Sequence, residues 1–127
     1  MSNSEKKTIL LIDDDEMIHQ VVKSITQDKY NLFFALSGDE AIKLMFQGLI
    51  PDLILLDILM PSMDGWETFS KIRAVSLLHD VPIAFLTSLQ SKEDMAHGKA
   101  LGAVDFLIKP IEADILLERI EKILNLK

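Results

Sequence analysis

Apolar residues follow two alternating patterns along this chain. Nearly continuous apolar runs predict strands buried on both faces of a sheet, and they span residues 8–12, 31–36, 53–56, 81–86 and 104–108. After each run, apolar residues recur every three or four positions, which is typical of an amphipathic helix. Five strands alternating with five helices predict right-handed crossovers. The expected fold class is therefore α/β, with a parallel sheet covered on both faces.

Turn and capping residues indicate where the helices begin and end. Ser37 and Glu40 fit a capping box at the start of the second helix. Ser91 can cap the fourth helix, and Gly102 is expected to end it. Asp15 precedes the first helix, where the helix dipole favours a carboxylate whether or not it binds a metal.

Composition narrows the class of protein further. A chain of 127 residues suits one domain, and a hydrophobic content of 49% supplies a core. The absence of cysteine excludes disulfides and thiolate chemistry and is compatible with the cytoplasm, where we expect the protein to act. The net charge of −7 argues against direct binding of nucleic acid. No apolar run approaches the roughly 20 residues of a membrane span, and residues 1–7, which do not resemble a signal peptide, are expected to be disordered.

Polar residues end four of the five predicted strands. These residues are Asp13 and Asp14, Asp57, Thr87, and Lys109. Because parallel strands end at the same edge of a sheet, these side chains are expected to be neighbours at the edge where such sheets bind ligands. Clustered carboxylates repel one another, and Mg²⁺, which prefers oxygen ligands, relieves that repulsion. An anionic nucleophile, a divalent cation, an ammonium and a hydroxyl predict phosphoryl transfer, with Asp57 as the nucleophile.

In this order and at these spacings, the motifs resemble those of response-regulator receiver domains. The matching segments are Asp13-Asp14, Asp57 with Met60-Pro61-Ser62-Met63-Asp64-Gly65, Thr87, and Phe106-Leu107-Ile108-Lys109-Pro110. The resemblance implies one receiver domain over residues 1–127 with a flavodoxin-like fold. That fold is a single doubly wound, five-stranded parallel sheet in the order 2-1-3-4-5 with five helices. The strand order is taken from the family and is not deduced from the spacing.

The resemblance also implies a role for each site residue. The protein would be a phosphorylation-dependent signalling switch and not an enzyme, since it would catalyse only its own phosphorylation and dephosphorylation. Asp57 would accept a phosphoryl group from a sensor histidine kinase or a phosphotransfer protein. Asp14, Asp57 and the backbone carbonyl of Leu59 would ligate Mg²⁺, and Asp13 would help through water. Lys109, preceding a cis bond to Pro110, would pair with the phosphoryl oxygens.

Other positions would relay the signal or set its lifetime. Thr87 would swing toward the phosphoryl group and Phe106 would turn inward, which would change the surface of the fourth helix, fifth strand and fifth helix. Leu59 and Leu89 occupy positions that tune attack by water in this family, and two apolar residues there predict slow self-dephosphorylation. The changed surface would bind a downstream protein, with no direct contact to nucleic acid or membrane. Because no output module follows residue 126, the output is expected to be a partner, a relay protein or a domain outside this sequence. The sequence leaves open whether the phosphorylated form dimerises.

Two alternative functions fit the sequence less well than a receiver domain, and three histidines show no pattern that supports a role in the site. Asp13-Asp14-Asp15 contains an Asp-x-Asp pattern that resembles small Mg²⁺-dependent aspartyl phosphatases of the haloacid-dehalogenase type, but Met17 departs from their motif and the chain has little room for their cap. A non-phosphorylated interaction module would not need the intact set of site residues. His19, His79 and His97 share no spacing and predict ordinary surface or partly buried side chains, not phosphorelay donors or metal ligands.

Overall fold

The computed structural model describes residues 6–125 of the chain. Of the segment predicted to be disordered, residues 1–5 lie outside the described residues, and Lys6 and Lys7 precede the first strand without regular structure. Within the described part of the chain, no helix is long and apolar enough to cross a membrane.

The strands form one parallel sheet, and its topology confirms the predicted order. The strands are β1 (Thr8–Ile12), β2 (Asn31–Ala35), β3 (Leu53–Leu56), β4 (Ile83–Thr87) and β5 (Asp105–Ile108). They pair in the order β2-β1-β3-β4-β5, and all four pairings are parallel. The carboxyl ends of all five strands therefore lie at one edge of the sheet, and their amino ends lie at the other.

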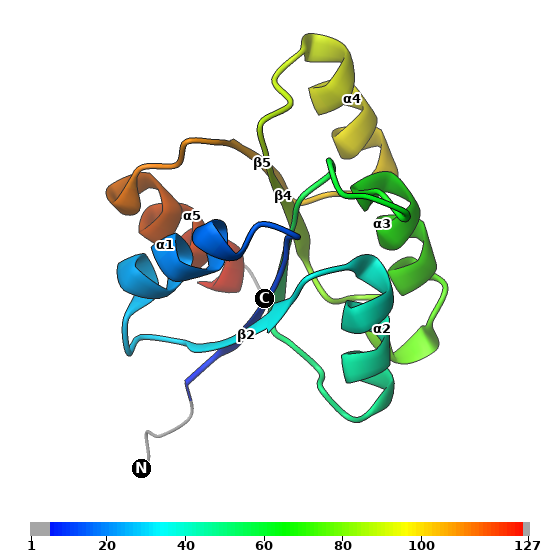
Figure 1. Ribbon diagram of the computed structural model, residues 1–127, viewed down its shortest axis with the longest axis horizontal. Coiled ribbons are helices and arrows are strands. Elements are labelled where there is room, and N and C mark those ends of the chain that lie inside the picture. Colours follow the sequence, from blue (N-terminus) through cyan, green and yellow to red (C-terminus); the bar gives the residue numbers. More distant parts are fainter. Residues whose placement is uncertain (1–5, 126–127) are drawn as a thin grey trace.

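Helices cover both faces of the sheet, as the alternation of elements predicts. The helices are α1 (Glu16–Thr26), α2 (Gly38–Phe46), α3 (Gly65–Arg73), α4 (Lys92–Leu101) and α5 (Ala113–Asn125), with a short 3₁₀ turn, η1 (Ser76–Leu78), before β4. Figure 1 shows α1 and α5 on one side of the sheet and α2, α3 and α4 on the other. This arrangement is the doubly wound architecture.

The core is divided by the sheet into two apolar clusters. In β3, Leu53 and Leu55 belong to the cluster that contains Leu116 of α5, whereas Ile54 and Leu56 belong to the cluster of α3. All four β3 side chains are fully buried, because successive strand residues point to opposite faces and both faces are covered. The apolar run thus holds the residue that follows it, Asp57, in a rigid position.

The predicted capping residues act as expected. The Ser37 hydroxyl accepts a hydrogen bond from the Glu40 N–H at 3.0 Å, and the Asp15 carboxylate accepts one from the Met17 N–H at 2.9 Å. Gly102 ends α4 with a positive φ of 106°, which a glycine adopts without steric cost.

Some predicted boundaries were wrong by one or two residues. The fourth strand begins at Ile83 and not at residue 81, because Pro82 has no N–H to donate to a neighbouring strand, and it runs one residue further, to Thr87. The second strand ends at Ala35, one residue early, and the fifth begins at Asp105, since Val104 lies half-exposed before it.

Candidate functional site

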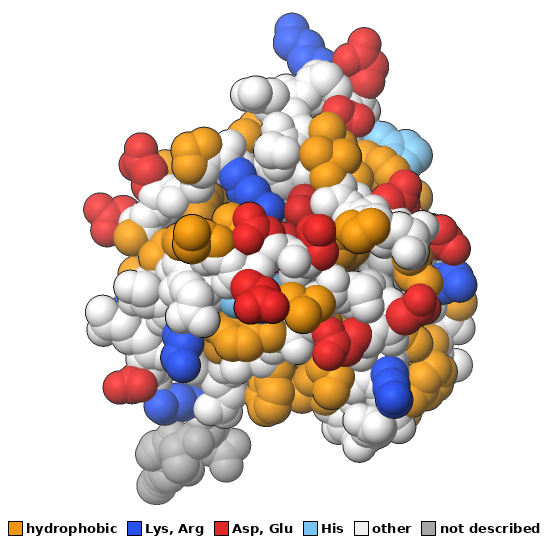
Figure 2. Space-filling model, in the orientation of Figure 1, with side chains coloured by type: hydrophobic (Ala, Val, Ile, Leu, Met, Phe, Trp, Pro, Cys, Tyr) orange, Lys and Arg blue, Asp and Glu red, His pale blue; other side chains and the backbone are white. Residues whose placement is uncertain are grey.

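Three carboxylates from separate parts of the chain meet at the carboxyl edge of the sheet. Asp13 and Asp14 directly follow β1, and Asp57 directly follows β3. One carboxylate oxygen from each of the three lies within 4.8 Å of the others. Asp13 and Asp57 are buried, with 0% and 4% of their surface exposed, whereas Asp14 is exposed. Figure 2 shows acidic side chains gathered near the middle of the face in view, with a basic side chain beside them.

Lys109 brings a positive charge to this cluster from the end of β5. Its Nζ atom lies 2.7 Å from Oδ2 of Asp13 and 3.2 Å from Oδ2 of Asp57. The Lys109 N–H donates a hydrogen bond to the Thr87 carbonyl at 2.8 Å, which ties the ends of β4 and β5 together. The bond between Lys109 and Pro110 is cis, as predicted.

Burial and charge pairing shift the pKa values of two ionisable groups in the cluster. Burial raises the pKa of Asp13, although hydrogen bonds from Lys109 and from the Asp15 N–H act in the opposite direction. Burial alone would lower the pKa of Lys109, but its hydrogen bond to Asp13 and the charges of Asp57 and Asp13 outweigh burial, so the Lys109 pKa is raised. When fully ionised, three carboxylates and one ammonium carry a net charge of −2 at the site. A divalent cation fits that charge.

The turn after Asp57 holds its carboxylate in place. Oδ1 of Asp57 accepts hydrogen bonds from the N–H groups of Ile58 at 2.7 Å and Leu59 at 3.3 Å. The Ile58 carbonyl accepts hydrogen bonds from the N–H groups of Met60 at 3.1 Å and Gly65 at 2.9 Å. Among the residues that the structure describes, no backbone N–H donates a hydrogen bond to the Leu59 carbonyl from this turn, so its oxygen is available to a metal.

Gly65 is required where the turn closes on Asp57. A Cβ atom at this position would lie 2.6 Å from Cα of Ile58 and would also meet the carbonyl oxygen of Asp57. The Asp64 carboxylate accepts a hydrogen bond from the Glu67 N–H at 3.0 Å and so begins α3 at this point. The Asp-Gly pair therefore ends the turn and starts the helix.

The two residues predicted to relay the signal, Thr87 and Phe106, lie on β4 and β5. Thr87 is fully buried at the end of β4, and its hydroxyl lies 3.4 Å from the N–H of the partly buried Leu89. Phe106 is partly buried, with its ring centroid 5.8 Å from that of Phe85. A Cβ atom on Gly98 of α4 would lie 3.0 Å from the Phe106 ring, so the glycine lets the helix approach this side chain.

His19 supports the site in a way that the sequence analysis missed. It is 4% exposed, it stacks on Phe34 of β2 with ring centroids 4.6 Å apart, and its Nε2–H donates to the carbonyl oxygen of Asp13 at 2.8 Å. His19 thus fixes the backbone between the two neighbouring carboxylates. The signal that could have found it is helical spacing, since His19, Val22 and Thr26 are the buried residues of α1.

The other two histidines lie outside the cluster formed by Asp13, Asp14 and Asp57. His79 pairs with Asp80 at 3.3 Å beyond η1, and His97 of α4 contacts Trp66 edge to face with ring centroids 4.2 Å apart. Neither has a place in the cluster formed by Asp13, Asp14 and Asp57.

Comparison with known proteins identifies the family. Residues 9–121 match the model of the response regulator receiver domain. The chain belongs to the response-regulator receiver family. Receiver domains serve two-component systems as phosphorylation-dependent switches, and they are signalling proteins, generally not enzymes, that bind Mg²⁺ at an acidic pocket.

Two relatives found by sequence comparison are longer than this chain. The transcriptional regulatory protein DltR of Streptococcus agalactiae is 36% identical over 113 residues, which cover 88% of this chain and 49% of DltR. The probable transcriptional regulator ycf27 of Cyanidium caldarium is 37% identical over 124 residues, which cover 97% of this chain and 48% of that protein. The chain thus spans about half the length of these relatives. Because they are named as transcriptional regulators, they lend no support to the prediction that nucleic acid is not contacted.

Solved structures of similar proteins match nearly the whole chain. The chemotaxis protein CheY4 of Vibrio cholerae is 34% identical, with a TM-score of 0.85 over 93% of this chain and 98% of that one. A putative response regulator from Chloroflexus aurantiacus is 30% identical, with a TM-score of 0.88 over 95% of this chain and 99% of that one. Both likenesses agree with the predicted flavodoxin-like fold.

Proposed function

We propose that this receiver domain is switched by transfer of a phosphoryl group from a phosphohistidine of a sensor kinase or phosphotransfer protein to Asp57. A carboxylate oxygen of Asp57 forms the new O–P bond while the N–P bond breaks, and the electron pair stays on the histidine nitrogen, which then takes a proton from solvent. The observation that carries this proposal is the buried Asp57 carboxylate. Its Oδ1 is held by two backbone N–H groups, and its Oδ2 faces the Lys109 ammonium at 3.2 Å.

Asp13, Asp14, Asp57 and the Leu59 carbonyl are the residues that would hold Mg²⁺. The fit rests on hard oxygen donors within 4.8 Å of one another and on the excess negative charge of the cluster. When bound, Mg²⁺ supplies charge neutralisation for the transferring phosphoryl group. Lys109 supplies a second positive charge from β5, while the N–H groups of Ile58 and Leu59 orient the Asp57 carboxylate.

The output surface is formed by α4, β5 and α5. After phosphorylation, the Thr87 hydroxyl donates to a phosphoryl oxygen and Phe106 turns inward. Support comes from α4, which buries only Gly98 among its residues and is therefore weakly anchored to the core. Met95 of α4 and Ile115 of α5 expose 36% and 38% of their surface, and they offer apolar contact to a downstream protein.

Chemical phosphorylation tests this function directly. The chain is incubated with Mg²⁺ and either acetyl phosphate or phosphoramidate, and its intact mass is measured. We expect the mass of one added phosphoryl group, absent in Asp57→Asn and retained in Asp39→Asn, whose carboxylate is exposed on α2. A wild-type chain that stays unmodified, or a modification that persists in Asp57→Asn, would refute the proposal. Turnover of phosphomonoesters would instead favour a phosphatase.

A further inference from the structure

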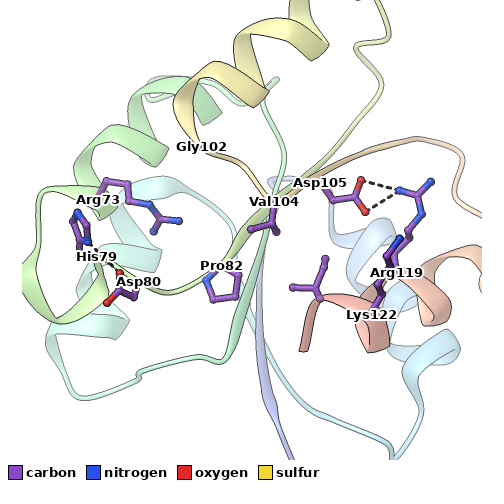
Figure 3. A pocket seen from close by; sticks show the side chains of 10 residues that line it. Arg73, His79, Asp80, Pro82, Gly102, Val104, Asp105, Arg119 and Lys122 are labelled. Carbon is purple, nitrogen blue, oxygen red and sulfur yellow. Dashed lines mark hydrogen bonds and ion pairs between the residues drawn. The ribbon is translucent and has the colours of Figure 1, made fainter. Parts of the chain in front are cut away.

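A hollow lies at the opposite edge of the sheet from the carboxylate cluster (Figure 3). Its volume is about 660 Å³, within the range of small-molecule sites. Pro82 and Val104 in its wall precede β4 and β5, whereas Asp57 follows β3 and Thr87 is the last residue of β4. The hollow is therefore formed by the amino edge of the sheet and is separate from the phosphorylation site.

Cationic side chains border this hollow on two sides. Figure 3 shows Arg73, from the last turn of α3, pointing into it from one side, while Arg119 and Lys122 of α5 lie at the other. Within residues 6–125, neither Arg73 nor Lys122 forms an ion pair with a carboxylate. The Arg73 guanidinium lies 5.0 Å from the Phe69 ring centroid and donates to the Leu78 carbonyl at 3.2 Å. These contacts hold a cation in place without neutralising it.

Burial removes part of the hydration of the Arg73 guanidinium, and no carboxylate of the described residues pairs with it. Burial lowers the pKa of Arg73, although the nearby charge of Asp80 acts in the opposite direction. A partly dehydrated guanidinium is stabilised by an anion that accepts hydrogen bonds from two of its N–H groups, and phosphate has the required geometry.

The carboxylates near the hollow leave it with a positive charge. Both oxygens of Asp105 accept from one guanidinium nitrogen of Arg119 at 2.8 Å, so this carboxylate is already paired. Asp80 exposes its whole side chain to solvent beside His79. Counting Arg73, Arg119 and Lys122 against these two carboxylates, the lining carries one excess positive charge in a chain whose net charge is −7.

The wall between the two cationic sides is apolar. Figure 3 shows the side chains of Pro82 and Val104 there, and Ile123 of α5 completes the lining. A bare phosphate ion would leave this surface exposed to water, whereas a phosphate attached to an aromatic or apolar group would cover it.

We propose that this hollow binds a small phosphomonoester that carries an aromatic or apolar group. The phosphate contacts the Arg73 guanidinium, and the apolar group lies on Pro82 and Val104. Lys122 adds attraction at longer range. The site needs neither Asp57 nor Mg²⁺, so the proposal goes beyond the proposed phosphorylation. Binding at the hollow can therefore be tested separately from phosphorylation of Asp57.

A titration followed by nuclear magnetic resonance tests this proposal, with phenyl phosphate as the probe and the Mg²⁺-free, isotope-labelled chain as the sample. We expect saturable shifts of the Gly102, Val104 and Ile123 amides, with millimolar affinity for so small a ligand. Arg73→Gln should weaken binding about tenfold, because a charge-assisted hydrogen bond is lost. Lys122→Glu should weaken binding about threefold. Lys43→Glu on α2 is the matched control and should change nothing.

Two further probes decide whether both halves of the ligand matter. Benzyl alcohol should bind more weakly because it lacks the anion, and inorganic phosphate should bind more weakly because it lacks the ring. Equal binding of benzyl alcohol, or equal binding of inorganic phosphate (an adventitious ion only), would overturn the proposal. So would shifts confined to the carboxyl edge, or an affinity unchanged in Lys122→Glu. If Arg73→Gln does not fold, Arg73→Lys, which keeps the charge but loses the planar fork, replaces it and should still weaken binding.

Discussion

The carboxylate cluster at one edge of the sheet and the hollow at the other carry opposite net charges, and the helix dipoles favour both. In this fold the helices run antiparallel to the strands, so helices begin at the carboxyl edge and end at the amino edge. The helix dipole favours acids at the beginning and bases at the end. Asp15 and Asp64 accordingly cap α1 and α3 at the first edge, while Arg73 and Lys122 occupy last turns of α3 and α5 at the second.

Burial is what distinguishes the carboxyl edge from its counterpart. Asp13 is 0% exposed and shares Lys109 with Asp57, whereas Asp80 at the amino edge exposes its whole side chain. Coulomb interactions strengthen as water is excluded, so equal charges have unequal effects at the two edges. Matched substitutions at the two edges can therefore test this difference.

Replacing the lysine of each edge should give the largest contrast. Without Mg²⁺ at neutral pH, Lys109→Met should lower the free energy of unfolding by about 3 kcal/mol, because two buried carboxylates lose their cation. Lys122→Met should change it by less than about 0.5 kcal/mol, because Lys122 is exposed and forms no ion pair within residues 6–125. Urea unfolding of both variants measures the difference. Equal losses would show that burial does not separate the edges.

Adding a methyl group to a glycine of each edge should give the next contrast. Gly65→Ala should lower the free energy of unfolding by about 2–3 kcal/mol, because its Cβ meets the backbone of Asp57 and Ile58. Gly48, before β3, has open space around it, so Gly48→Ala carries only the cost of its positive φ, about 1 kcal/mol. Thermal unfolding of the two variants makes the comparison, and an equal loss in both would contradict the close packing of the turn that follows Asp57.

The lifetime of the phosphorylated form should depend on the carboxyl edge alone. Combining Leu59→Asn with Leu89→Glu should speed dephosphorylation roughly tenfold, or about 1.4 kcal/mol, because polar groups would then guide water to the acyl phosphate. Leu77→Asn, an exposed residue of η1, is the control. Loss of the phosphoryl mass over time gives the rates. An unchanged lifetime in the double variant would remove these leucines from the account.

The pH dependence of stability should give the smallest contrast. Because burial raises the folded-state pKa of Asp13 above its usual 3.8, folding favours the protonated form. Stability from this group is present below pH 3.8 and is lost as the pH rises through the raised value. Asp13→Asn should therefore match the wild type in acid and become the more stable of the two as the pH rises. Unfolding in urea at several pH values without Mg²⁺ measures this divergence, and parallel pH profiles of the two proteins would contradict it.

Local patterns predicted most of the fold and the members of the candidate site. The apolar runs and the caps at Ser37 and Gly102 depend on near neighbours in the chain, so they can be recognised without coordinates. The convergence of Asp13, Asp57 and Lys109 follows once the sheet is parallel. The strand order and the residue roles came from a resemblance to a family and not from spacing.

Features that depend on how distant elements pack against one another were not predicted from the sequence. His19 contacts Phe34 and the Asp13 backbone only because of the rotation of α1 against β2. Arg73 and Lys122 are far apart in the sequence and form no motif, so their convergence on one hollow could not be predicted.

The most direct test of the central claim is a Mg²⁺ titration of the isotope-labelled chain, observed at the amides that follow β1, β3 and β5. If strand ends form one site, the amides of Asp14, Ile58 and Lys109 should shift together with a single dissociation constant, and Asp14→Asn should weaken all three responses. Shifts with separate dissociation constants, or a response that Asp14→Asn leaves unchanged, would contradict a shared metal site at the carboxyl edge.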